Sequence, residues 1–135
     1  MAKSAIYTVN LASQTVAVNG VIDPGMVVRR FGCNLNLSGN AINVSGPGYY
    51  DVDANFTISP TAIGTVTVSV YKDNVLVPGM TASETVAAVS TSVNLSIDGL
   101  IREMCSCCDE TSNLTFVLSG VPATVANTAI VVEKL

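Results

Sequence analysis

The cysteines are the most concentrated reactive side chains in this chain. Three of the four lie within four residues, at Cys105, Cys107 and Cys108, and the fourth is Cys33. Four thiolates can bind one zinc ion, but structural zinc sites commonly use two Cys-x-x-Cys pairs, and this chain does not contain two. On a regular strand Cys108 would face away from Cys105 and Cys107, so one tetrahedral site could not use all three.

Three interpretations of these thiols therefore stand. They are buried small hydrophobes, or Cys33 forms a disulfide with the cluster or across subunits, or they bind a metal. We expect packed thiols. The N-terminus lacks the apolar core of a signal peptide, and the reducing compartment in which such a chain is made disfavours disulfides.

The remaining polar side chains do not form a recognisable catalytic set. The chain has no histidine, which excludes serine–histidine and cysteine–histidine nucleophiles. Asp51 and Asp53 resemble the start of a calcium-binding loop, but Phe56 stands where that loop needs glycine and Ala62 where it needs its closing glutamate. We expect two solvated carboxylates on one strand face. The sequence predicts a non-enzymatic protein with no catalytic, cofactor-binding or metal-binding residues and no cofactor.

The charge and hydrophobicity of the chain indicate which partners it can have. A net charge of −4 and a pI near 4.4 argue against nucleic acid. No apolar run approaches the roughly 18 residues of a membrane span. Charged residues make up only 12% of the chain, against about 25% in typical soluble domains. That is too little charge to cover a monomer, so we expect part of the apolar surface to lie in a subunit interface.

The elements that must position these residues read as strands. After the turn Gly46-Pro47-Gly48, apolar and polar residues alternate up to Ser59, as in a strand with one buried and one wet face. Similar rows of inward residues recur, at Val66, Val68 and Val70; at Val93, Leu95 and Ile97; and at Leu114, Phe116 and Leu118.

Turn signals separate these rows at intervals of about 8–12 residues, which is typical of a sandwich or barrel. They include Asn19-Gly20, Asp23-Pro24-Gly25, Pro78-Gly79 and Asp98-Gly99. No segment shows helical spacing of apolar residues. We therefore predict one all-β domain over residues 1–135. The dispersed apolar residues of segment 1–14 also allow an extended N-terminal arm.

From Asn34 to Leu135 the order of features resembles the jelly-roll family of tumour-necrosis-factor-like and complement globular heads, in its bacterial or phage branch. The likeness is carried by the strand entering at Gly48-Tyr49-Tyr50, the hairpin reaching Val75-Leu76-Val77-Pro78-Gly79, the Leu114-Thr115-Phe116 strand and the aliphatic C-terminal strand ending in Lys134-Leu135. The resemblance implies a ten-strand jelly-roll β-sandwich. It also implies a homotrimer with the last strand near the threefold axis.

These observations predict a structural protein: a trimeric decoration or knob protein on the surface of a phage-like particle such as a capsid, made in the cytoplasm without a signal peptide. The alternatives are a trimeric recognition head for a host glycan or receptor, and a spore-surface protein. Sugar recognition favours exposed aromatic rings. The tyrosines are only Tyr7, Tyr49, Tyr50 and Tyr71, and Tyr50 belongs to the predicted core, which favours the structural role.

Thiol titration tests the expected state of the cysteines. Denatured protein prepared without reductant should show all four thiols free. A disulfide from Cys33 to the cluster would close a loop of about seventy residues and contribute roughly 4 kcal/mol. Fewer than four free thiols, together with a melting temperature that falls on reduction, would contradict the expectation.

Overall fold

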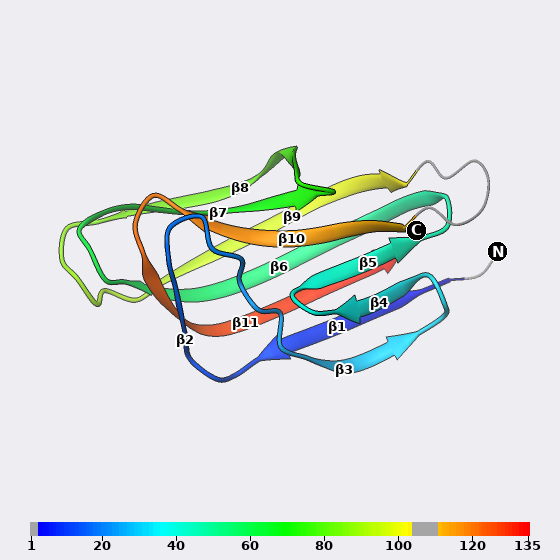
Figure 1. The fold of residues 1–135 in the computed structure, drawn as a ribbon, viewed down its shortest axis with the longest axis horizontal. Coiled ribbons are helices and arrows are strands. Elements are labelled where there is room, and N and C mark those ends of the chain that lie inside the picture. Colours follow the sequence, from blue (N-terminus) through cyan, green and yellow to red (C-terminus); the bar gives the residue numbers. More distant parts are fainter. Residues whose placement is uncertain (1–2, 104–110) are drawn as a thin grey trace.

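The structure, a computed structural model, describes residues 3–103 and 111–135, which form two antiparallel sheets and no helix (Figure 1). The strands are β1 (Ala5–Asn10), β2 (Gln14–Val16), β3 (Met26–Phe31), β4 (Leu35–Ser38), β5 (Ala41–Ser45), β6 (Gly48–Pro60), β7 (Gly64–Lys72), β8 (Val75–Val86), β9 (Val93–Glu103), β10 (Thr111–Ser119) and β11 (Ala123–Lys134). The prediction of an all-β sandwich is confirmed.

The two sheets have five principal strands each. One has the order β3-β1-β11-β6-β9, with the three-residue strand β2 added to β11, and the other has the order β4-β5-β10-β7-β8. Consecutive strands often lie in different sheets, so the connections cross between layers, as in a jelly roll. The ten principal strands match the number that the resemblance implies, and β2 is an addition to it.

Strand β6 is the predicted strand that follows the Gly46-Pro47-Gly48 turn. Its predicted inward residues are all buried: Tyr50, Val52, Ala54, Phe56 and Ile58. The Tyr50 hydroxyl donates to the carbonyl oxygens of Ser45 and Gly46 at 3.0 and 2.9 Å, which satisfies the one polar atom of this buried ring. The ends of β5 and β6 are thereby held together.

The core lies between the two sheets. The inward residues of β7 and β10, from Val66 to Val70 and from Leu114 to Leu118, face those of β6 and β11. Phe56 and Phe116 pack across the layers with ring centroids 5.8 Å apart and planes tilted by 54°. Small β-branched side chains fill the rest, as expected for a chain with 5% aromatic residues.

The N-terminal arm is not found from Ala5 onward. β1 lies between β3 and β11, and Ile6 and Thr8 are buried. The sequence obscures this strand because Ile6 is the only apolar one of its two buried residues, so its row of inward residues shows no apolar alternation.

Two predicted turns are also wrong, because both lie inside strands. Pro78-Gly79 falls within β8, where the pairing with β7 shifts register and Gly79 has a φ of 82°, so the proline and glycine form an irregularity in the strand. Asp98-Gly99 falls within β9, where Gly99 pairs with Val52 of β6.

Gly99 is required by packing rather than by a turn. A Cβ on Gly99 would lie 2.6 Å from Cγ and 2.7 Å from Sδ of Met80, which is buried. Gly99 lies in the six-stranded sheet and Met80 in the five-stranded sheet. The Met80 side chain therefore fills the space that a side chain on residue 99 would need.

The substitution Gly99→Ala should therefore lower the free energy of unfolding by about 1–3 kcal/mol, the range for overpacking a filled site. The same substitution in a Met80→Ala background should cost much less, because the truncated side chain leaves room for the new methyl group. Denaturant unfolding of the wild type, the two single variants and the double variant measures the coupling free energy between Gly99 and Met80. An equal cost in both backgrounds would show that Met80 is not the reason for the glycine.

Candidate interaction surfaces

The outer face of the six-stranded sheet, turned away from the five-stranded sheet, carries an ordered row of side chains. Arg29 of β3 pairs with Tyr7, Tyr7 with Val131, Val131 with Asp53, and Asp53 with Asp98 of β9. Directly paired residues of antiparallel strands point to the same side, so these five share one face. We call them the charged row. It is basic at the β3 end, apolar in the middle and acidic at the β9 end.

The adjacent row on this face has apolar residues at both ends. Phe31 pairs with Ala5, which is followed across the sheet by Glu133, Asp51 and Leu100. Phe31 is 54% exposed and Leu100 52% exposed, so the described chain leaves both uncovered. Side chains of this size at the surface indicate a binding surface when they gather on one face.

The acidic side chains of the two rows are close enough to affect one another. Partial burial raises the pKa of Asp51, a hydrogen bond with Asp98 raises it further, and the charges of Asp98, Asp53 and Glu133 act in the same direction. The expectation of two solvated carboxylates on one strand face therefore leaves out two further acids of the same face. Asp98 and Glu133 were missed because they come from other strands, and only the register of β6 with β9 and β11 reveals them.

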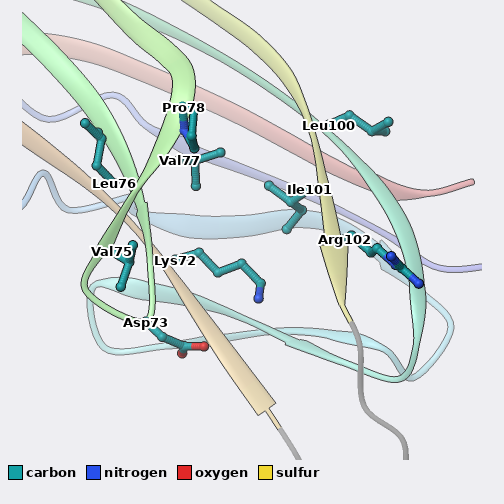
Figure 2. Close-up of a pocket in the computed structure, with 9 residues that line it drawn as sticks. All are labelled: Lys72, Asp73, Val75, Leu76, Val77, Pro78, Leu100, Ile101 and Arg102. Atoms are coloured by element: carbon teal, nitrogen blue, oxygen red, sulfur yellow. The ribbon is translucent and has the colours of Figure 1, made fainter.

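A groove lies beside this face, between the β7–β8 hairpin and β9 (Figure 2). Its volume is 420 Å³. Its apolar lining comes from Val75, Leu76, Val77, Pro78, Leu100 and Ile101. Lys72, Asp73 and Arg102 add charge, and the Arg102 guanidinium lies 5.7 Å from the centroid of the Tyr49 ring. The groove lies where β8 and β9, the edge strands of their sheets, come together.

Lys72 also pairs with a buried acid at the end of the core. Its Nζ lies 3.6 Å from Oε1 of Glu103, a residue that is only 5% exposed. The Ser112 hydroxyl donates to the same Oε1 at 3.0 Å. Glu103 continues the inward alternation of β9 after Ile101, so the sequence period places a carboxylate in an apolar position. Lys72 and Ser112 compensate for it at Oε1, while the buried Oε2 has no hydrogen-bond partner among the described residues.

For Cys33 the expectation of a buried, packed thiol is wrong, because its position in the turn between β3 and β4 leaves it exposed, and for the other three cysteines the expectation stays a prediction. Cys33 is exposed and has no disulfide partner among residues 3–103 and 111–135. Cys105, Cys107 and Cys108 lie outside the described residues. Within the described ranges no three His, Cys, Asp or Glu side chains are grouped so that they could hold a metal ion. The helix-free described chain also contains no helix that could cross a membrane.

The raised pKa of Asp51 predicts how its charge affects stability. The folded state holds this proton more tightly than the unfolded chain, so ionisation of Asp51 lowers stability at neutral pH, and the loss disappears as the pH falls below the ordinary aspartate value of 3.8. Asp51→Asn should increase the free energy of unfolding at pH 7 by up to about 1 kcal/mol, the scale of surface charge interactions. The gain should vanish near pH 3.

Glu84→Gln is the matched control, because Glu84 is an exposed acid of β8 in the other sheet. Thermal unfolding at pH 3, 5 and 7 measures both variants. A gain from Asp51→Asn that is the same at all three pH values would contradict the assignment.

Comparison with known proteins identifies the fold but no sequence relative. No family model and no curated protein matches the sequence. Among solved structures, murine APRIL at pH 5.0 superposes with a TM-score of 0.74 at 13% identity, covering 99% of this chain and 100% of that one. The PRD1 vertex protein P5 superposes with a TM-score of 0.69 at 16% identity, covering 98% and 96%.

The globular domain of zebrafish complement 1qA protein also superposes, with a TM-score of 0.68 at 7% identity, covering 97% of this chain and 94% of that one. These superpositions span nearly the whole chain, so they include β1. The resemblance seen in the sequence began only at Asn34. The chain has the jelly-roll fold shared by tumour-necrosis-factor-like proteins and complement globular heads.

Proposed function

We propose that this protein is a non-enzymatic structural protein that forms a homotrimer on the surface of a phage-like particle. The observation that carries the proposal is the outer face of the six-stranded sheet, which exposes Tyr7, Phe31, Leu100 and Val131 in a chain with few charges. Such a face is stabilised when copies cover it for one another, and a closed rotational assembly does so with a single kind of contact.

The particle setting is supported by the fold. One of the structures that superpose over nearly the full chain is named as a vertex protein, P5 of PRD1. The chain also has no histidine, so it has none of the histidine-based nucleophile arrangements, which supports a structural or binding role over catalysis. Mass spectrometry of purified particles would test this location, and cryo-microscopy would show where on the particle the protein lies.

A second candidate is a trimeric recognition head that binds a host glycan or receptor, with a spore surface as another setting. The groove beside β9 favours it, since an apolar lining with cationic side chains could receive a ligand. Tyr49 is 48% exposed next to this region, although its ring already contacts Arg102. Glycan-array binding that is lost in Tyr49→Ala would favour this function over a purely structural one.

The homotrimer is directly testable. Native mass spectrometry and light scattering of the whole chain at micromolar concentration should report an assembly of three copies. Tyr7→Arg, which places a charge in the apolar middle of the charged row, should shift the population toward monomer while the monomer keeps its β-sheet circular dichroism. A stable wild-type monomer would contradict the proposed assembly.

A further inference from the structure

The opposite charges of the charged row lie too far apart to attract each other within one molecule. Four strand-to-strand steps separate Arg29 at one end from Asp98 at the other. At about 4.8 Å per step the backbones of these residues lie roughly 19 Å apart. Charges on a surface are largely screened beyond about 8–10 Å at ordinary salt concentrations. Opposite charges on one face of this sheet therefore do not compensate each other.

Neither end of the row is compensated elsewhere in the described chain. The only ion pair among residues 3–103 and 111–135 joins Lys72 to Glu103, away from the charged row. Its acidic end is under repulsion, because Asp98, Asp53 and Glu133 all act on Asp51. A cation brought to this end would relieve that repulsion as well as forming its own contact.

Arg29 is suited to supply that cation. Its neighbour Arg30 pairs with Ile6, whose side chain is buried, and the Arg30 Nε donates to the Leu35 carbonyl oxygen at 2.6 Å. Arg29 instead pairs with Tyr7 and shares its outer face. β3 is also the edge strand of the sheet, so Arg29 lies where a neighbouring molecule can reach it.

We propose that the outer face joins copies of this chain head to tail, with Arg29 of one copy contacting Asp53 and Asp98 of the next. The inference rests on the proposed homotrimer and specifies how its subunits recognise one another. The second row fits the same junction, because Phe31 lies beside Arg29 at the β3 end and Leu100 lies beside Asp98 at the β9 end. An apolar pair next to the ion pair excludes water from it.

Head-to-tail contacts use two different patches of each subunit. In the proposed trimer the rotation between neighbouring copies is a third of a turn, so these contacts close into a ring rather than an open filament. Each copy then offers its basic edge to one neighbour and its acidic edge to the other. All the junctions are equivalent, and no second protein is needed to neutralise the face.

Charge reversal tests this pairing. Arg29→Asp and Asp98→Arg should each weaken assembly of the full chain by about 30-fold or more, because each places like charges in contact at a desolvated junction. The double variant restores an opposite pair in every junction and should recover most of the loss. Glu84→Arg, a reversal on β8 of the other sheet, is the matched control and should leave assembly unchanged.

Native mass spectrometry across a dilution series measures the assembly, and circular dichroism confirms that each variant is folded. Raising sodium chloride from 50 to 500 mM should weaken assembly of the wild type more than assembly of either single variant, because Arg29→Asp and Asp98→Arg have each lost the attractive pair. If the wild type is a monomer, the proposed trimer itself fails. If it is a trimer but both reversals are silent, or the double variant is not rescued, the trimer stands and the head-to-tail pairing is wrong. A closed dimer would also overturn the ring.

Discussion

The two-residue period of β6, paired on one side with β11 and on the other with β9, governs most of this structure. Tyr50, Val52, Ala54, Phe56 and Ile58 enter the core, so the intervening residues must all point outward. The strand cannot slip by one residue without exposing its apolar set. The position of Asp51 and Asp53 on the outer face is thus a direct consequence of how the core is packed.

The same constraint explains the concentration of acid on that face. Once β6 is in register, Glu133 must lie beside Asp51 and Asp98 beside Asp53. The core therefore imposes a repulsive arrangement that lowers the stability of the folded chain at neutral pH. Acids kept close together on a surface, opposite an arginine on the same sheet, are better explained by contacts outside the single chain than by stability within it.

The sequence predicts the strands that alternate strongly and fails where structure depends on distant residues. The rows of β6, β7, β9 and β10 were read directly from alternation, because burial of one face acts on every second residue. Two dipeptides that favour turns lie inside strands instead. Pro78-Gly79 forms an irregularity in β8, and the glycine of Asp98-Gly99 leaves space for Met80. The outer face needed the register of five strands, and no local pattern carries that information.

The C-terminal strand β11 lies inside the six-stranded sheet, where it pairs with β1, β2 and β6 and joins Ala5 to Glu133 in register. When β1 leaves the ribosome it therefore has no partner on its β11 side until β11 has been made more than a hundred residues later. Long-range pairing of this kind slows folding, and the waiting chain exposes unpaired apolar strands. Termination before Ala123 would therefore remove the strand at the centre of this sheet, whereas loss of β3 or β9 would remove only an edge strand.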